Sequence, residues 1–222
     1  MKTVAFIPIK LNNERTPGKN IKPFDDGMPL MYFVQYSLLM LKKEKLIDHI
    51  YVYCSDLAVK DYLLEGIEYL VRPERLDRKE TKGTEIYLEF VNTIDADIYI
   101  LAHATSPFIK VENIRTCLEK VKSGEYDSAF CAKKIQSFLW SSGKPLNFSL
   151  GNPPRTQDMD PIYQEQSTPY IFTKGAFKKF KARTGEKPFI CECSDIECID
   201  IDYPEDFELA NLIYMNLLRK GK

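Results

Sequence analysis

The chain has 222 residues, of which 44% are apolar and 28% are charged, so it is long enough to bury a substantial core. Its formal net charge of -1 excludes the strong basic excess of a general nucleic-acid binder. No apolar run approaches the roughly 20 residues that cross a bilayer, and Thr3 to Pro8 is too short for the apolar part of a signal peptide. We therefore expect a cytoplasmic domain that binds neither nucleic acid nor membrane.

Three apolar runs rich in β-branched and aromatic residues mark the first half of the chain: Val4–Ile9, His49–Cys54 and Asp97–Ala102. Each is nearly continuous rather than alternating, which is typical of parallel strands covered on both faces. Helical spacing or capping residues predict helices at 29–41, 55–64, 84–91 and 111–122, and a short strand is expected at 67–71. This alternation predicts a Rossmann-like, doubly wound and mostly parallel α/β sheet.

The second half of the chain changes character. Residues 137–169 are rich in Pro, Gly, Asn and Gln without a helical period, which favours an excursion from the sheet, either a hairpin or a dimer-forming lobe. Around it we expect strands at 127–132, 169–173 and 196–201, and helices at 175–180 and 204–218. The prediction is one domain, residues 1–222, with an inserted dimerisation and acceptor lobe at about 137–169.

The first predicted strand leads into a loop with three cations, Lys10, Arg15 and Lys19, and a turn at Pro17-Gly18. In an open α/β sheet, ligands bind beyond the carboxyl ends of the strands. The cations are suited to phosphate oxygens, and the turn can present backbone N–H groups to the same anion. A solvated loop with scattered charges is the alternative. The spacing Gly-x4-Gly-Lys-Ser/Thr is absent, which disfavours a P-loop kinase or ATPase.

Two carboxylates, Asp200 and Asp202, close the predicted strand at 196–201. Residues two apart on a strand point to the same face, so we expect both carboxylates to project together. Hard oxygen ligands of this kind suit Mg²⁺, which also binds substrate phosphates. The alternative is that these acids cap the helix that begins near Pro204.

Two further groups of polar residues follow predicted strands or lie in the irregular segment. His103, Thr105 and Ser106 come directly after the third strand, where they can contact a ligand or cap the next helix. Arg155 and Gln157 lie in the excursion, and a planar Arg with a nearby amide can hold a carboxylate in two-point fashion. A structural hydrogen bond for His103 and a surface ion pair for Arg155 are the competing interpretations.

The chain has six cysteines and two histidines. Cys191 and Cys193 with Cys198 lack the Cys-x2-Cys spacing of a zinc knuckle, and the histidines are His49 and His103. We therefore expect reduced, structural thiols, as in a cytosolic enzyme.

Taken in order, these motifs resemble the acylneuraminate cytidylyltransferases, the enzymes that make CMP-sialic acid and related CMP-activated nonulosonic acids. The resemblance runs from Thr3 to about Ile213. It is carried by the first strand with its basic loop and Pro17–Asn20, by Ser55-Asp56, Arg72-Pro73, Thr105–Pro107 and Pro154-Arg155, and by Ile199–Ala210.

The resemblance implies transfer of CMP from CTP to a small carboxylated acceptor, a nonulosonic or related 2-keto sugar acid, with release of pyrophosphate. It implies a homodimer and Mg²⁺ held by Asp200 and Asp202. It also implies roles for three groups of residues: catalytic cations Lys10, Arg15 and Lys19; nucleotide-binding Lys10, Asn12, Lys19, Arg72 and Thr84; and acceptor-binding His103, Thr105, Ser106, Arg155, Gln157 and Glu165.

Several positions depart from the family pattern. Lys10 stands where the family usually has Arg, Glu14 where it has Lys, and His103 where Gln is common; residues 164–167 replace an Arg-Pro-Asn-Gly segment. Arg15 is placed to replace the lost positive charge. These departures favour an acceptor other than N-acetylneuraminate. They also keep two alternatives open: a nucleotide-binding protein without catalysis, and a glycosyltransferase of related fold.

Overall fold

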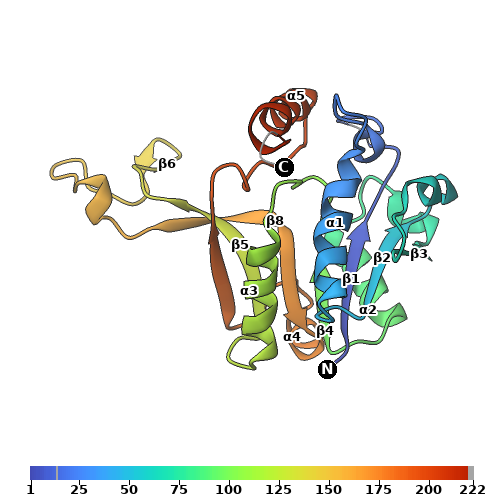
Figure 1. The fold of residues 1–222 in the computed structure, drawn as a ribbon. Helices are drawn as coiled ribbons and strands as arrows, with labels where there is room; N and C mark the ends of the chain where they lie inside the picture. Colours follow the sequence, from blue (N-terminus) through green and yellow to red (C-terminus); the bar gives the residue numbers. More distant parts are fainter. Residues whose placement is uncertain (14, 220–222) are drawn as a thin grey trace.

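The computed structural model describes residues 1–13 and 15–219, and in this part of the chain seven strands form one sheet in the order β3-β2-β1-β4-β8-β5-β9 (Figure 1). Neighbouring strands are parallel except that β8 runs antiparallel to β4 and β5. The expected Rossmann-like, mostly parallel sheet is therefore confirmed. The strand bounds are β1 Thr3–Pro8, β2 His49–Cys54, β3 Glu68–Val71, β4 Ile98–Leu101, β5 Ser128–Ile135, β6 Trp140–Ser141, β7 Lys144–Pro145, β8 Ile162–Thr173 and β9 Pro188–Cys193.

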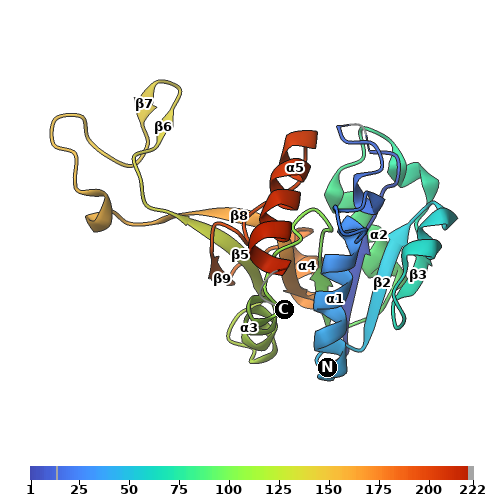
Figure 2. The same cartoon turned by 45° about the horizontal axis from the view of Figure 1, so that its top comes forward.

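Helices cover both faces of the sheet. The α-helices are α1 Leu30–Lys43, α2 Gly83–Thr93, α3 Val111–Lys122, α4 Lys174–Phe180 and α5 Pro204–Ile213. Short 3₁₀ helices lie at η1 Lys19–Ile21, η2 Leu57–Tyr62, η3 Glu74–Asp77 and η4 Thr156–Asp158, and the π-helical turn η5 Tyr214–Leu218 follows α5. Helices α1 and α3 pack on one face and α2 and α4 on the other, as Figures 1 and 2 show together.

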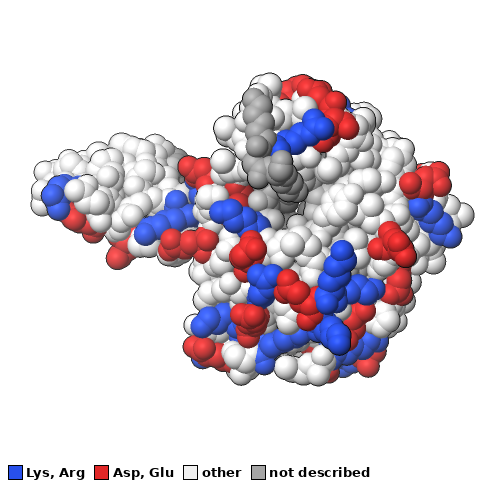
Figure 3. Space-filling model, viewed as in Figure 1, with Lys and Arg blue, Asp and Glu red and all other residues white. Residues whose placement is uncertain are grey.

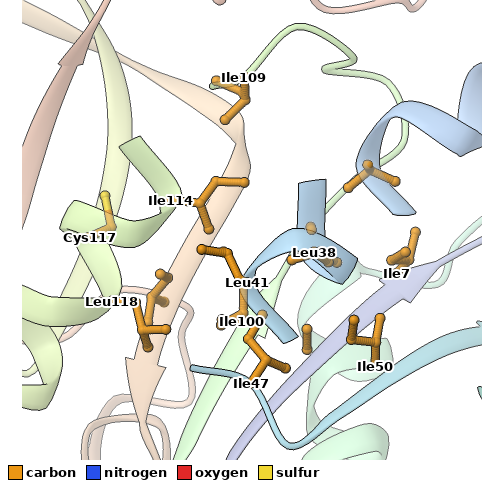
Figure 4. Close-up of a cluster of buried hydrophobic side chains, with 14 of the residues drawn as sticks. Ile7, Leu38, Leu41, Ile47, Ile50, Ile100, Ile109, Ile114, Cys117 and Leu118 are labelled. Atoms are coloured by element: carbon orange, nitrogen blue, oxygen red, sulfur yellow. The ribbon is translucent and has the colours of Figure 1, made fainter. Parts of the chain in front are cut away.

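Strand β1 shows why the sequence of a central strand is continuously apolar. Ala5 and Ile7 point into the core under α1 and α3, whereas Val4 and Phe6 point into the core under α2, and all four are 0% exposed. Figure 4 shows Ile7 among the apolar side chains of the first of these cores. On the other face, Phe6 stacks on Phe90 with the ring centroids 4.1 Å apart. This two-sided packing fixes the carboxyl end of β1, from which the basic loop leaves.

The strand order creates a switch point between β1 and β4. After β1 the chain moves outward through β2 and β3, then returns to place β4 on the other side of β1. The loops that follow β1 and β4 therefore leave the same edge of the sheet on either side of a crevice, which is where ligands of such sheets bind.

The predicted strand at 196–201 is wrong. The last strand of the sheet is β9, which pairs in parallel with β5, and residues 195–198 form a turn. The turn forms because the buried Glu197 carboxylate accepts hydrogen bonds from Ser194 Oγ (2.7 Å) and Asn113 Nδ2 (2.6 Å). The apolar residues after it, including Ile201, pack against α5 instead of entering the sheet.

Two other elements differ in detail from the prediction. The helix expected at 55–64 is the 3₁₀ helix η2, although Asp56 caps it as predicted, accepting from Ala58 N at 2.9 Å. Strand β8 begins at Ile162, so residues 162–165 pair with β5 before the strand, after a shift in register, reaches the expected segment 169–173.

Residues 136–161, here called the arm, project from the body between β5 and β8 (Figures 1 and 2). The arm carries the β6–β7 hairpin and η4. A small aromatic cluster packs within the arm: the ring centroids of Phe138 and Trp140 lie 4.6 Å and 5.4 Å from that of Phe148. Phe138 and Trp140 nevertheless remain exposed, as do Leu146 and Leu150.

Across residues 1–13 and 15–219, none of the helices combines the length and apolar character that crossing a membrane requires.

Candidate functional site

A cavity of about 560 Å³ lies at the switch point, beyond the carboxyl ends of β1 and β4. Positive charge is concentrated in its wall even though the chain as a whole has a net charge of -1. Elsewhere charges of both signs are interspersed, as Figure 3 shows for one face of the body. The cavity is therefore locally suited to an anionic ligand. Among the described residues that line it, the charged ones are Lys10, Arg15, Lys19, Arg72, Arg78, Lys79, Arg183, Asp200 and Asp202.

Lys19 is the most firmly held of the cations in the loop after β1. It begins η1 directly after Gly18, whose φ of 68° lies in the left-handed region that glycine adopts without strain. Lys19 is only 7% exposed, and its Nζ donates to the Ile201 carbonyl at 2.6 Å and to Asp202 Oδ1 at 3.1 Å. The next residue, Asn20, donates from Nδ2 to the Lys10 carbonyl at 2.9 Å. The loop is thus fixed at both ends.

Arg15 forms a second, looser contact with the same carboxylate. Its Nη1 lies 2.8 Å from Asp202 Oδ2, but the two side chains are 59% and 46% exposed. An ion pair this exposed contributes about 0–1 kcal/mol, so it can open when a stronger anion or a cation enters. The buried Lys19 contact would then still hold Asp202 in place.

Asp200 and Asp202 both line the cavity, although they lie in a loop and not on a strand. Asp206 Oδ2 holds this loop by accepting from Asp202 N at 3.0 Å, and Ile201 N donates to the Thr105 carbonyl at 2.9 Å. Asp200 Oδ2 accepts from Ser167 Oγ at 2.7 Å.

The second oxygen of Asp200 is unusual. Asp200 Oδ1 is buried and has no hydrogen-bond partner among the described residues. A buried carboxylate oxygen without a partner is costly unless a ligand satisfies it. With Asp202 beside it in the cavity wall, the oxygen is of the type that Mg²⁺ takes, so this pair of residues fits a magnesium site.

His103 is a positioned, neutral wall residue. Its Nδ1 donates to the Ser167 carbonyl at 2.5 Å, which leaves Nε2 to accept from the Tyr87 hydroxyl at 3.3 Å. Burial lowers the pKa of His103 below its ordinary value, so the ring is neutral at physiological pH. Thr168 Oγ1 also accepts from His103 N at 2.7 Å, so β8 holds the loop after β4 in place.

Arg72 lines the opposite wall but is already paired. It is 2% exposed, and its Nη2 and Nε donate to Asp77 Oδ1 at 2.5 Å and 3.1 Å. Ser55 donates to the other oxygen of the same carboxylate, and Lys10 Nζ donates to the Asp77 carbonyl at 2.8 Å. Arg72 and Lys10 therefore both hold η3, and the segment that follows η3 brings Arg78 to the cavity.

Several predicted site residues lie elsewhere in the chain. Asn12 is exposed and Asn13 lines the cavity instead. Thr84 on α2 and Glu165 on β8 border a second cavity of about 440 Å³. Ser106 is buried, and its Oγ has no partner among residues 1–13 and 15–219. Thr105 lines the main cavity, and Glu14 lies outside the described residues.

Arg155 and Gln157 lie on the arm, outside the residues that line the cavity. Arg155 forms a two-point ion pair with Asp158, three residues along, with Nε–Oδ2 at 2.7 Å and Nη2–Oδ1 at 3.1 Å. Gln157 is exposed, and its carbonyl accepts from Gln136 at 3.2 Å. Within a single chain, neither residue takes part in the site.

Arg183 is the main residue that the sequence analysis missed. It follows α4 and borders both cavities, with its guanidinium 3.8 Å from the centroid of the Tyr170 ring and Nη2 3.3 Å from Glu165 Oε2. No motif marks it, because β8 and α4 bring it to the site only through the tertiary fold. Arg78 and Lys79 were also missed, although the cation-rich stretch 72–82 between a strand and a helix is a signal that could have found them.

Comparisons with known proteins agree with this architecture. Residues 4–221 match the family described as Cytidylyltransferase. The chain is 25% identical over 217 residues to an N-acylneuraminate cytidylyltransferase of Oncorhynchus mykiss, covering 93% of this chain and 49% of that protein. It is 27% identical over 226 residues to a CMP-N,N'-diacetyllegionaminic acid synthase of Legionella pneumophila, covering 95% of each. The chain thus spans about half the length of the first relative and nearly all of the second.

A solved structure shows the same fold. The structure of a CMP:2-keto-3-deoxy-manno-octonic acid synthetase complexed with CTP aligns with a TM-score of 0.70 at 17% identity, covering 97% of this chain and 99% of that one.

Proposed function

The chain belongs to the cytidylyltransferase family, and from this premise we propose that it transfers CMP from CTP to a carboxylated sugar, a nonulosonic or related 2-keto acid. One observation carries the proposal. A cluster of cations and two carboxylates, Asp200 and Asp202, converge in one cavity at the switch point of the sheet, and one oxygen of Asp200 has no partner among the described residues. A triphosphate with a bound divalent cation complements that pattern of charge.

The reaction requires little from the protein except positioning and charge stabilisation. An acceptor hydroxyl oxygen attacks the α-phosphorus of CTP, the bond to the bridging oxygen of the β-phosphate breaks, and pyrophosphate and a proton leave. Negative charge grows on the departing pyrophosphate. Lys10, Arg15 and Lys19 extend from one loop into the cavity, where fixed cations stabilise that charge without reorganising.

Asp200 and Asp202 are the residues proposed to hold Mg²⁺. When bound, the ion would polarise the α-phosphate and neutralise developing charge. The chain's own contribution is orientation: Ser167 fixes one oxygen of Asp200, and Lys19 fixes one oxygen of Asp202, whose other oxygen has only the exposed contact with Arg15.

The acceptor is proposed to lie toward the second cavity, where Arg183 stands between the two spaces. The Arg183 guanidinium is partly exposed and held over Tyr170, and its planar fork suits a carboxylate. His103, neutral and fixed by Ser167, offers a hydrogen-bonding wall rather than a second charge. This side of the site would select an acid by its carboxylate and hydroxyls.

We also propose that the protein is a homodimer joined through the arm. Trp140 and Leu150 are 56% and 68% exposed on a segment that extends away from the body (Figure 2). Large apolar side chains gathered on such a projection favour a partner surface. In this arrangement Arg155 would act on the neighbouring chain, since it lies on the arm and outside its own cavity.

A cytoplasmic location is proposed because all six cysteines, which fall within the described residues, are free thiols.

The test is pyrophosphate release from each of the four nucleoside triphosphates, with and without Mg²⁺, against a panel of 2-keto sugar acids and smaller carboxylated acceptors. We expect release with CTP, one acceptor class and Mg²⁺ together. CTP binding without release across the panel would support the alternative of a nucleotide-binding protein that has lost catalysis. Failure to bind CTP would refute the proposal.

A further inference from the structure

Three buried cysteines from separate elements come together outside the cavity. Cys117 lies on α3, Cys131 on β5 and Cys191 on β9, and their Sγ atoms all lie within 4.8 Å of one another. Cys131 and Cys191 are direct partners in the parallel register of β5 and β9, and α3 packs over these two strands. Figure 4 shows Cys117 on α3 at the border of the apolar core. The three side chains are at most 8% exposed, so their sulfurs meet in the interior of the protein.

Cys193 provides a fourth thiol. It follows Cys191 by two residues on β9, so both side chains project from the same face of the strand. Its sulfur accepts from Asn113 Nδ2 at 3.5 Å, and its thiol donates to the Cys191 carbonyl at 3.7 Å. Cys193 is also partly exposed, which gives an ion a route from solvent to the buried sulfurs.

Packing alone does not require this arrangement. A buried cysteine behaves as a small apolar residue, and alanine or valine would fill a helix–sheet contact equally well. Three thiols within 4.8 Å of one another, with a fourth two residues along the same face of β9, instead supply the ligand types of a closed tetrahedral site, such as a structural zinc site. Among the described residues, Cys117, Cys131 and Cys191 form the one group of three or more His, Cys, Asp or Glu side chains close enough to hold an ion.

We propose that Cys117, Cys131 and Cys191, with Cys193 as the fourth ligand, bind one thiophilic cation of the Zn²⁺ class. On binding, the thiols become thiolates and their protons are released to solvent, so the affinity should increase with pH. With all four positions filled by protein, the site leaves no place for a substrate and is structural.

The position of the site indicates what it would stabilise. β9 is an edge strand of the sheet, and β5 leads directly into the arm. A cation shared by α3, β5 and β9 would fasten the edge of the sheet and the root of the arm to the body. This inference does not depend on the proposed reaction, because the cluster lies outside both cavities.

The experiment begins with wild-type protein that has been reduced, stripped with a chelator and kept without oxygen. Co²⁺ and then Zn²⁺ are titrated in. We expect about one Co²⁺ per chain, with a thiolate-to-cobalt charge-transfer band and tetrahedral ligand-field bands, and we expect Zn²⁺ to displace it. Zn²⁺ should also raise the unfolding temperature, since it binds only the folded cluster.

Cysteine substitutions show whether the cluster binds a metal ion or only packs in the core. Cys131→Ala should abolish the cobalt spectrum, whereas Cys54→Ala should keep it, because Cys54 is equally buried but lies on β2 outside the cluster. If Cys131→Ala does not fold, Cys193→Ser replaces it and should weaken Co²⁺ binding at least tenfold. A reduced wild-type protein that binds neither ion stoichiometrically would overturn the proposal, as would a Cys131→Ala or Cys193→Ser variant that binds as well as wild type.

Discussion

The cavity and the arm carry similar charged side chains on very different supports. In the cavity, Lys19 is anchored by the Ile201 carbonyl and Asp202, residues that are more than 180 positions away in the sequence. On the arm, Arg155 is held only by Asp158, three positions along, and both side chains are more than half exposed. The difference teaches that the cavity is organised within one chain, whereas a role for the arm's Arg155 depends on a second surface.

The largest effect is expected at the carboxylates. Asp200→Ala with Asp202→Ala should reduce turnover about 1000-fold, since both proposed ligands of Mg²⁺ are lost. Pyrophosphate release measures the change. Asp195→Ala is the matched control, because Asp195 is an acid in the same region of the chain but is 82% exposed and paired with Lys133. Unchanged turnover in the double variant would contradict the metal assignment.

The second largest effect is expected at Lys19, the anchored cation of the cavity. Lys19→Met keeps the length of the side chain but removes the charge, and we expect kcat/KM for CTP to fall about 100- to 1000-fold. Lys22 lies three residues after Lys19, and its side chain is 41% exposed and pairs with Glu208; Lys22→Met should behave as wild type. Equal effects of the two substitutions would mean that the loop supplies only general positive charge.

Arg155→Ala tests the arm. The fold should be unaffected, because an exposed pair contributes about 0–1 kcal/mol, but activity should fall roughly 10- to 100-fold through loss of a charged contact to the acceptor. Sedimentation should show a dimer for both the wild type and the variant.

Mixing variants decides whether the arm acts on the neighbouring chain. The Arg155→Ala protein and the Lys19→Met protein are mixed so that they exchange subunits. In a mixed dimer, one of the two sites then has both Arg155 and Lys19, and part of the activity should return. If mixed dimers form and no activity returns, Arg155 does not complete the partner's site.

The smallest expected effect concerns acid stability. Burial lowers the pKa of His103 in the folded state, so the unfolded chain binds the proton more readily. The free energy of unfolding should therefore decrease as the pH falls below the pKa of histidine in the unfolded chain, about 6.5, and continues toward the lower pKa of the folded state. His103→Gln should remove part of this loss in thermal unfolding scans between pH 7 and pH 5. His49→Gln is the control, since His49 is half-buried on β2 beside Glu68 and away from the cavity, and it should leave the loss in place.

The fold could be predicted well where the local signal and the packing agree. β1 and β2 are nearly continuous apolar runs because helices cover both faces of the sheet, and α3 begins and ends at the residues that its spacing predicts. The strand expected at 196–201 failed because its apolar residues pack on α5, and because Glu197, the acid that forms the turn, finds its partners on α3 and in the preceding loop.

The site could be predicted in part for the same reason. Lys10, Arg15 and Lys19 follow a strand directly, so their place at the sheet edge could be inferred. Arg183 could not, because its position depends on how β8 and α4 fold against α2. The cysteine cluster could not be predicted for the same reason. Spacing motifs detect metal ligands that lie a few residues apart, whereas these sulfurs come from three separate elements, α3, β5 and β9.

The most direct test of the central claim is to follow the α-phosphate of CTP. Protein, Mg²⁺ and CTP labelled at the α-phosphate are incubated with each sugar acid, and the products are separated and identified by mass spectrometry. The account predicts that the label appears in a CMP conjugate of one sugar acid, with one unlabelled pyrophosphate formed for each conjugate. Label that stays in CTP, or appears only as free CMP, while CTP binds in the cavity would contradict it.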